Sequence, residues 1–562
     1  MIPIGGAATA RLGRCSRTGG EGPMNKARCR SVLRRRRPLL SFPIILLVLL
    51  SAGTCGRSRA PAHPNVLWVL WDTTRADRFS LYGHTRPTTP FLDRWAKQAR
   101  VFENCLSISN TTVPSHASMF TNLLPPEHGA DNTYCLLRDE HETLAEIFRK
   151  GGYQTFLYSE NPLIASETGF GQGFDRVVNP WSDEYRDRAA EILENKIPRP
   201  VRSPELGARL RTPGITHWAL SPCGLLGETA LTDWLARRDR QRPYFAFLNY
   251  MEAHATVITP ASYRARMMNQ EDVIRSYTMN VTPAAMWQYT FRIADYSADD
   301  LRIIGGTYDA ALLELDDLFK GIITALQKSG DLENTIIVLA SDHGENLGEH
   351  HLLGHEFFLY DPVLHIPLVL FYPPAVPSGR ETRPVVNMDL FPTLLELANL
   401  EAPERPRPAS RSLLDPVPRR TRVAYLRTPP EPPFEEARRA DPQFDPTPYR
   451  RTLLAISEDP HKLIVGTDGG QALYDLREDP AESRDLFPQR PELGQRLMDD
   501  LRQFVAGRTA ARFPVGAPQL TEAQKEVLRS LGYVGIADAK PAGAPDSGRS
   551  PDGETPAIPP ER

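Results

Sequence analysis

Five continuous apolar runs mark the chain up to residue 371, at 65–71, 153–158, 244–248, 335–340 and 366–371. Runs without polar alternation are typical of strands that are buried on both faces of a parallel sheet. Stretches with helical spacing lie between them, at 90–99, 144–150, 308–327 and 390–400. This alternation predicts an α/β fold, with a doubly wound and mostly parallel sheet flanked by helices.

The pattern changes further along the chain. Apolar runs at 462–465 and 473–476, followed by a helical pattern at 491–505, predict a smaller C-terminal α+β subdomain. We therefore expect five segments: an export signal region (1–55), a main domain (64–401) with irregular insertions at 161–240 and 255–300, a Pro- and Arg-rich connector (402–450), the subdomain (451–535) and a disordered tail (536–562).

The N-terminal segment has the layout of an export signal. Four arginines, Arg34 to Arg37, precede the apolar run 39–50, and small residues follow it. The run is short for a membrane span, which needs about 20 residues. Met24 is a candidate true start. Cys55 is a candidate lipidation site, although Ala52-Gly53-Thr54 before it matches a lipobox poorly. We expect an extracytoplasmic protein, periplasmic or membrane-anchored, that contacts a membrane only through this segment.

Composition narrows the function classes. The formal net charge is −3, and ten of the 66 Lys and Arg lie in the first 54 residues, so the rest of the chain is acidic. This distribution lacks a basic tract and argues against binding to nucleic acid. The six cysteines contain no C-x-x-C pair, which excludes a cysteine zinc site and a disulfide framework, while one Cys105–Cys135 bridge stays open.

Candidate metal ligands follow two of the predicted strands. Asp72 ends the first apolar run, and Asp342-His343 follows the run at 335–340. A carboxylate at such a position is costly to bury unless it is paired or bound to a metal. Two carboxylates and an imidazole suit a divalent ion: Mn, Zn or Mg, with Ca also compatible. The alternative is that either aspartate only caps the segment that follows.

A candidate nucleophile lies in Thr112-Val113-Pro114-Ser115-His116. Pro114 is well placed for the start of a short helix at 115–121. A hydroxyl at such a start faces backbone N–H groups, which favour an anion. A metal-bound threonine oxygen would be a stronger nucleophile. The alternative is a simple helix cap.

The chain resembles the sulfatase family of the alkaline-phosphatase superfamily over most of residues 64–535. The resemblance is carried by NVLWVLWDTTRADRFSLYGHTRPTTPFLD from residue 65, TVPSHAS from 112, TIIVLASDHGENLGEHHLLGHEFFLYDPVLHIPLVLFYP from 335 and HKLIVGTDGGQALYDLREDPAESRDL from 461. It implies an alkaline-phosphatase-like fold.

The resemblance also assigns roles to single residues. It implies that Asp72, Asp342 and His343 bind the metal, and that Thr112 is the nucleophile and also contacts the metal. His254 and His355 fall at catalytic and substrate-binding positions, and in a two-metal relative they would hold a second ion instead. His116 stands at a substrate-contacting position.

Departures from the family pattern indicate the subtype. The family's nucleophile motif is C-x-P-S-R, with Cys or Ser converted to formylglycine, but Thr112 cannot form that aldehyde and His116 replaces the arginine. The family's Asp-Asp pair is Asp72-Thr73, and its Asp-Asn pair is Asp342-His343. These features resemble the threonine-nucleophile branch, which includes phosphoglycerol and phosphoethanolamine transferases and related phosphoesterases.

Three hypotheses follow for the function. The first is an exported enzyme that cleaves or transfers a sulfate or phosphate ester through Thr112, with phosphoester chemistry slightly favoured. The second is a sulfuric ester hydrolase that works without formylglycine. The third is a non-catalytic binding protein on the same scaffold. The expected partner is a sulfated or phosphorylated small molecule, glycan or lipid head group.

Overall fold

The computed structural model describes residues 63–131, 135–198, 222–403, 409–506 and 508. The predicted export signal, Met24, Cys55 and the predicted tail lie outside these residues. None of the helices in the described part of the chain is long and apolar enough to cross a bilayer.

The predicted α/β fold is confirmed. A nine-stranded sheet has the order β10-β2-β9-β6-β1-β5-β3-β4, and β11 pairs with β2. Its central strands are parallel, whereas β9 runs antiparallel to both β6 and β2. The bounds are β1 Asn65–Trp71, β2 Arg100–Leu106, β3 Gln154–Ser159, β4 Arg176–Val178, β5 Tyr244–Tyr250, β6 Thr335–Ala340, β9 His365–Phe371, β10 Gly379–Glu381 and β11 Val385–Val386.

Strand β1 shows why these runs are continuously apolar. Val66, Trp68 and Leu70 belong to the hydrophobic core on one face of the sheet. The alternate residues Leu67, Val69 and Trp71 belong to the core on the other face. All seven residues of β1 are buried. A strand that is covered on both faces has no position left for a solvated side chain.

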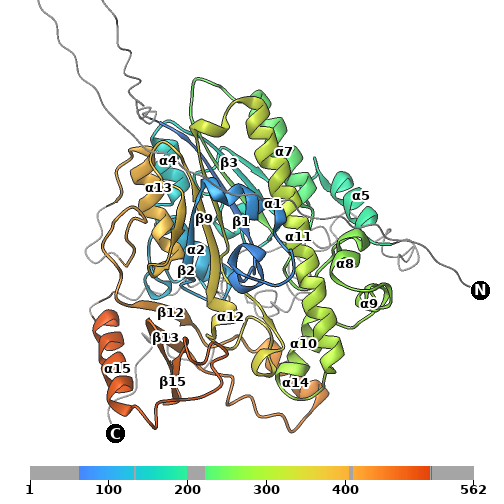
Figure 1. Ribbon diagram of the computed structural model, residues 1–562, viewed down its shortest axis with the longest axis vertical. Helices are drawn as coiled ribbons and strands as arrows, with labels where there is room; N and C mark the ends of the chain where they lie inside the picture. Colours follow the sequence, from blue (N-terminus) through green and yellow to red (C-terminus); the bar gives the residue numbers. More distant parts are fainter. Residues whose placement is uncertain (1–62, 132–134, 199–221, 404–408, 507, 509–562) are drawn as a thin grey trace, which may run out of the picture. The chain divides into compact units, whose positions relative to one another are not determined.

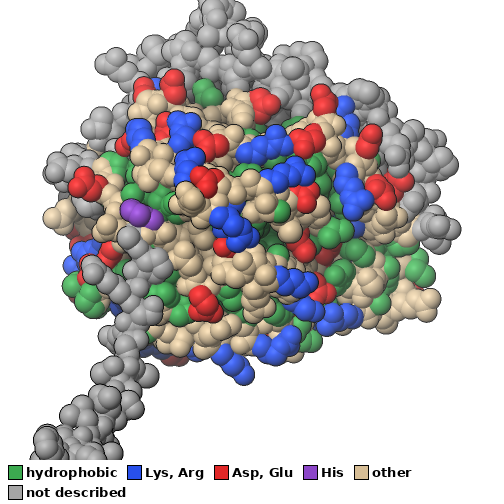
Figure 2. Space-filling view, turned by 90° about the horizontal axis from the view of Figure 1, so that it is seen from above, with side chains coloured by type: hydrophobic (Ala, Val, Ile, Leu, Met, Phe, Trp, Pro, Cys, Tyr) green, Lys and Arg blue, Asp and Glu red, His purple; other side chains and the backbone are tan. Residues whose placement is uncertain are grey.

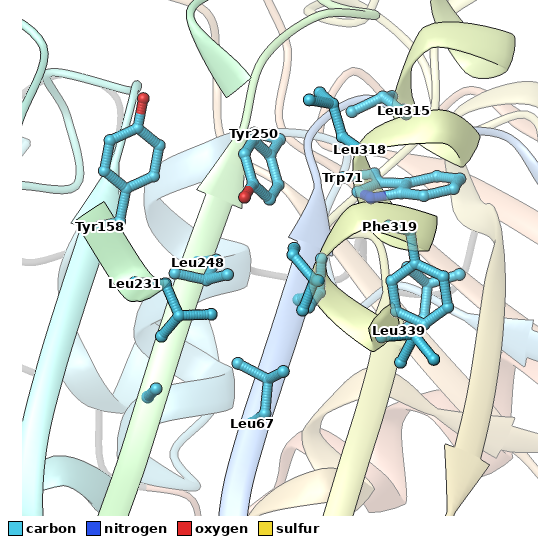
Figure 3. Packing of buried hydrophobic residues seen from close by; sticks show 14 of the residues in the cluster. Leu67, Trp71, Tyr158, Leu231, Leu248, Tyr250, Leu315, Leu318, Phe319 and Leu339 are labelled. Carbon is cyan, nitrogen blue, oxygen red and sulfur yellow. The ribbon is translucent and has the colours of Figure 1, made fainter. Parts of the chain in front are cut away.

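Helices cover both faces of the sheet (Figure 1). The helices α2 Thr112–Thr121, α4 Leu144–Lys150 and α13 Leu390–Ala398 contribute to the first core. The second core contains residues of α1 Pro90–Trp95, α5 Arg186–Lys196, α7 Gly224–Arg237 and α11 Ala298–Ser329. Figure 3 shows part of the second core, where Trp71 of β1 packs beside Phe319 of α11.

The insertions contain regular structure. The segment predicted as irregular at 255–300 forms three short helices, α8 Ala261–Met267, α9 Gln270–Ser276 and α10 Pro283–Thr290. Helix α11 begins at Ala298, ten residues before the predicted start. Ser297 caps it by accepting a hydrogen bond from the backbone N–H of Asp300. A second small sheet pairs β7 Asn346–Leu347 with β8 Leu353–Gly354, and α3 Pro125–His128 and α12 Asp361–Leu364 are single turns.

The C-terminal subdomain is a four-stranded antiparallel sheet with the order β12-β13-β14-β15. Strands β13 Leu453–Glu458, β14 His461–Gly466 and β15 Gln471–Asp475 and helix α15 Pro491–Val505 lie in the predicted subdomain. Its edge strand β12 Arg422–Leu426, and helix α14 Pro432–Ala440, come from the segment predicted as a connector. The sheet of the subdomain therefore begins about 30 residues earlier than its predicted boundary.

Cys105, Cys135 and Cys223 are buried free thiols, so the Cys105–Cys135 bridge is not formed. Basic and acidic side chains are interspersed on the face seen in Figure 2.

Candidate functional site

Two neighbouring strands bring the predicted metal ligands together. Strands β1 and β6 are parallel, and their register pairs Leu70 with Ala340. Asp72 and Asp342 each lie two residues beyond this pair, so both carboxylates emerge at the same edge of the sheet. One ligand atom from each of Asp72, Asp342 and His343 lies within 4.8 Å of the others, and all three residues are buried.

The two carboxylates are only partly hydrogen-bonded. Asn161 Nδ2 donates to Asp72 Oδ2 at 2.9 Å, and the backbone N–H groups of Thr73 and His343 donate to Asp342 Oδ1. Asp72 Oδ1 and Asp342 Oδ2 have no hydrogen-bond partner among the residues that the structure describes. Buried carboxylate oxygens are costly in this state, so these two atoms fit a cation.

The pKa values of the two carboxyl groups also favour a bound cation. Burial, reinforced by the charge of Asp342, raises the pKa of Asp72 to about 6. Burial likewise raises the pKa of Asp342 to about 7, against the hydrogen bonds that it accepts. Both shifts show that two charged carboxylates side by side are costly here, and a bound cation would remove this cost.

The imidazole of His343 presents its Nε2 to this cluster. Its Nδ1 donates to the backbone carbonyl of Gly344 at 3.0 Å, so the lone pair of the neutral ring is on Nε2. Nε2 lies 3.3 Å from Asp342 Oδ2. Burial lowers the pKa of His343, which favours the neutral form that binds metals. The donor set of two carboxylates and one imidazole thus fits a divalent ion.

The turn after β1 is held in a strained conformation. Thr73 has φ +58°, a left-handed conformation that β-branched residues rarely adopt. The Tyr308 hydroxyl donates to its carbonyl at 2.7 Å, and Asp342 accepts from its N–H. These contacts from α11 and from the end of β6 fix the turn that carries Asp72.

Thr112 lies in this cluster. It is the first residue of α2, with Thr111 at the N-cap, and so the helix begins three residues before its predicted start. Thr112 Oγ1 lies 3.3 Å from His343 Nε2, and the side chain is fully buried. The positive end of the helix dipole favours negative charge at this position.

His254 and His355 border the cluster. The ring centroid of His355 lies 4.4 Å from that of His343 and 5.6 Å from that of His254. His355 Nδ1 lies 3.2 Å from the backbone carbonyl of Asn110, and His254 Nδ1 lies 2.6 Å from that of Ala255. Burial lowers the pKa of both rings. The ring of His355 is therefore in contact range of both His343 and His254.

His116 lies beneath the cluster rather than at its edge. Its ring is fully buried and packs edge-on against Phe170 and Phe247. Nδ1 lies 3.0 Å from the Thr112 carbonyl and 3.5 Å from Asp342 Oδ2. Its predicted contact with substrate stays a prediction.

Two asparagines near the cluster are not among the site residues predicted from the sequence. Asn161, just after β3, orients Asp72 through the hydrogen bond described above. Asn249 of β5 pairs in register with Leu70, is fully buried and has no hydrogen-bond partner for either amide atom within the described ranges. Neither belongs to a motif. The only signal was their position at the carboxyl ends of apolar runs, where ligands gather in such sheets.

Comparisons with known proteins identify the family of the chain. The family model described as "Sulfatase" matches residues 64–400. The N-acetylglucosamine-6-O-sulfatase of Bacteroides thetaiotaomicron is 24% identical over 419 residues, which cover 66% of this chain and 74% of that protein. Arylsulfatase K of Gallus gallus is 25% identical over 504 residues, 82% of this chain and 87% of that protein.

Solved structures show the same fold. The phosphonate monoester hydrolase of Agrobacterium radiobacter superposes with a TM-score of 0.61 at 21% identity, covering 79% of this chain and 96% of that chain. A structure in complex with its substrate D-glucosamine-2-N,6-O-disulfate superposes with a TM-score of 0.58 at 19% identity, covering 79% and 97%.

Proposed function

The chain belongs to the sulfatase family, and from this premise we propose that it hydrolyses sulfate or phosphate monoesters with Thr112 as the nucleophile and one divalent ion on Asp72, Asp342 and His343. Hydrolysis of sulfate or phosphate esters is the activity that the family and its relatives establish. The observation that carries the finer proposal is the 3.3 Å distance between Thr112 Oγ1 and His343 Nε2, inside a cluster with two unpartnered carboxylate oxygens.

The chemistry of the nucleophile follows from its surroundings. When bound, the ion would neutralise charge on the ester oxygens and favour the alkoxide form of a nearby hydroxyl. Thr112 Oγ1 attacks sulfur or phosphorus in line, the bond to the alcohol oxygen breaks, and the alcohol leaves with a proton. Water then cleaves the ester on Thr112, which regenerates the hydroxyl and releases sulfate or phosphate.

His355 and His254 have two candidate roles. In one role Nε2 carries a proton and donates it to the ester, and in the other its lone pair binds a second metal ion. Because His355 Nδ1 is engaged with the Asn110 carbonyl, the neutral ring has only a lone pair at Nε2. An anionic ester in the site would favour the imidazolium form, which donates from Nε2 to the ester oxygens. We propose this substrate-binding role for both rings. The alternative, a second metal ion, would use the lone pairs.

The presence of a threonine at the nucleophile position favours phosphoester chemistry slightly. A threonine cannot be converted to the formylglycine of the sulfate-ester enzymes that the sequence resembles. Transfer of the phosphoryl group to an acceptor alcohol is the alternative to release into water. A sulfuric ester hydrolase that works through the threonine itself is the second candidate. It is favoured by the sulfatases among the relatives.

The test is a substrate panel. Purified, metal-stripped protein is assayed on aryl phosphate, phosphonate monoester, phosphodiester and aryl sulfate substrates, with Mn, Zn, Mg or Ca added singly. We expect turnover of at least one monoester that depends on the added ion. Turnover of every substrate without a metal, in the presence of chelator, would contradict the proposed site.

We also propose that the protein is exported. The support is the arginine block Arg34 to Arg37 directly before the apolar run 39–50, in a segment outside the described residues. Fractionation of the native host should recover the mature chain outside the cytoplasm. Recovery of the full-length chain in the cytosol, with its N-terminus intact, would contradict this.

A further inference from the structure

His254 lies on a short turn that follows β5. The strand ends at Tyr250, and the backbone N–H of His254 donates to the carbonyl of Met251 at 3.0 Å. Residues 251–254 belong to no helix or strand. The place of the His254 ring therefore depends on side chains that hold this turn from neighbouring elements.

Two buried glutamates hold the turn. Glu160, just after β3, accepts a hydrogen bond from the Met251 N–H through its Oε2 at 2.7 Å. Glu252 lies in the turn itself, and its Oε1 accepts from the backbone N–H of Gly224, the first residue of α7, at 2.7 Å. Both glutamates are fully buried. Buried carboxylate charges are costly unless a cation balances them, so the turn needs a positive group nearby.

Lys196, the last residue of α5, supplies a positive charge to Glu252. The side chain is buried, and its Nζ lies 3.1 Å from Glu252 Oε1 and 2.7 Å from Glu314 Oε1 of α11. Burial opposes the charge of the amine, but Glu314 and Glu252 raise its pKa above the ordinary value, so the ammonium is the stable form. Glu252 Oε2 has no hydrogen-bond partner within the described ranges. The donors printed on this carboxylate are thus Lys196 and the Gly224 N–H, both on Oε1.

The start of α7 approaches Glu252 closely. A Cβ added to Gly224 would lie 2.9 Å from Glu252 Oε1, so the absence of a side chain at this position is what permits the contact. The helix start and the ammonium group leave the carboxylate little freedom, and the turn that carries His254 follows its position.

We propose that Lys196 is a positioning residue of this enzyme: through Glu252 it fixes the turn 251–254 and so holds His254 in its place beside the metal site. This inference rests on the proposed function, in which His254 binds the ester. Without Lys196 the charge of Glu252 would be buried without a cation beside it, and the turn would rearrange to relieve this cost. Helix α5, which lies in the predicted insertion, then takes part in shaping the site.

The test is a double-mutant cycle between Lys196 and His254. Metal-loaded wild type, Lys196→Met, His254→Gln and the double variant are assayed on the best ester of the panel. Each single change should raise KM by about tenfold, with a smaller effect on kcat. The double variant should be no worse than His254→Gln alone, because the turn has lost the ring that Lys196 positions. Lys196→Arg keeps the charge and should recover most of the loss.

Arg238→Met is the matched control for loss of stability. Arg238 also forms a buried ion pair, with Asp331 at 2.8 Å, but it lies over the ring of Tyr244 at the opposite end of β5. This variant should lose stability and keep the KM of the wild type. If Lys196→Met does not fold, Glu252→Gln takes its place in the cycle, because it keeps the volume of the side chain.

Calorimetric titration of the same metal-loaded proteins with inorganic phosphate and inorganic sulfate gives a readout that needs no turnover. Lys196→Met and His254→Gln should weaken anion binding to a similar extent, and the double variant no further. Additive losses in the cycle, or a KM of Lys196→Met equal to that of the wild type, would overturn the inference and leave the proposed function intact. Absence of turnover on any ester would overturn the proposed function, and the anion titrations would then decide the role of Lys196.

Discussion

Thr112 Oγ1 and His343 Nε2 lie 3.3 Å apart, although 231 residues separate them in the chain. Thr112 is placed by the start of α2, and His343 by the end of β6. Both elements are buried, and so are Thr112 and His343, so the distance does not depend on a surface loop. A nucleophile on a packed helix and a ligand beside a core strand are positioned before any substrate arrives.

The raised pKa values predict an unusual pH dependence for the metal-free protein. The folded-state pKa values of Asp72 and Asp342, about 6 and about 7, lie above the ordinary value of 3.8. Protonation therefore favours the folded state. Their contribution to stability is fully present below about pH 4 and is lost as the pH rises through 6 to 7. Each tenfold gain in proton affinity on folding corresponds to ~1.4 kcal/mol.

Thermal unfolding of chelated and metal-loaded protein between pH 5 and 8 checks this. The melting temperature of the chelated protein should fall with pH, and the gap to the loaded protein should widen because protons and metal compete for the carboxylates. Asp342→Asn should flatten both trends. A trend in the variant identical to that of the wild type would contradict the assignment.

Asn161→Ala should weaken metal binding while leaving the fold intact. The variant removes the hydrogen bond that orients Asp72, and loss of such outer partners costs about 10- to 100-fold in metal affinity. Titration with the metal measures this. Asn179→Ala is the matched control, because Asn179 is also buried and donates to a carbonyl, that of Ser159, at 2.8 Å. Equal affinities in the two variants would count against the role of Asn161.

His355→Gln should raise KM or lower kcat without changing the metal content. If His355 binds the ester, both wild type and variant hold one ion per chain, because the three ligands of the first ion are untouched. Elemental analysis after dialysis counts the ions. A drop from two ions to one in the variant would instead establish the second metal.

Lys462→Met should destabilise the protein by about 3–5 kcal/mol, as expected when a buried ion pair loses one partner. Lys462 of β14 is fully buried and lies 2.8 Å from both Asp361 of α12 and Glu482. Denaturant unfolding measures the loss. Lys150→Met, which removes an exposed pair with Glu142, should stay within about 1 kcal/mol of wild type. Similar small losses in both variants would contradict this account.

Much of the sheet could be predicted because its central strands are covered on both faces. The bounds of β1 and β6 agree with the apolar runs to the residue. Strand β2 was missed, since Glu103 and Asn104 interrupt its pattern and are only half-buried. Strand β12 was missed because Pro and Arg dominate the segment around it. The early start of α11 had a signal in Ser297 and Asp300, which form a capping box.

The ligand residues of the candidate site could be named from the sequence, but their geometry could not. The position at a strand end was enough to predict Asp72 and Asp342 as ligands. Their proximity depends on the register that pairs Leu70 with Ala340, which only the tertiary structure gives. Asn161 belongs to no sequence motif that would indicate a role at the metal site.

The most direct measurement of the central claim is turnover by Thr112→Ala and Thr112→Ser, on the best ester of the panel and with saturating metal. Thr112→Ala removes the attacking oxygen and should lower kcat by at least about 10³-fold, with unchanged metal content and a melting temperature near wild type. Thr112→Ser keeps the oxygen and should retain measurable activity. Activity of Thr112→Ala close to wild type would contradict the covalent mechanism.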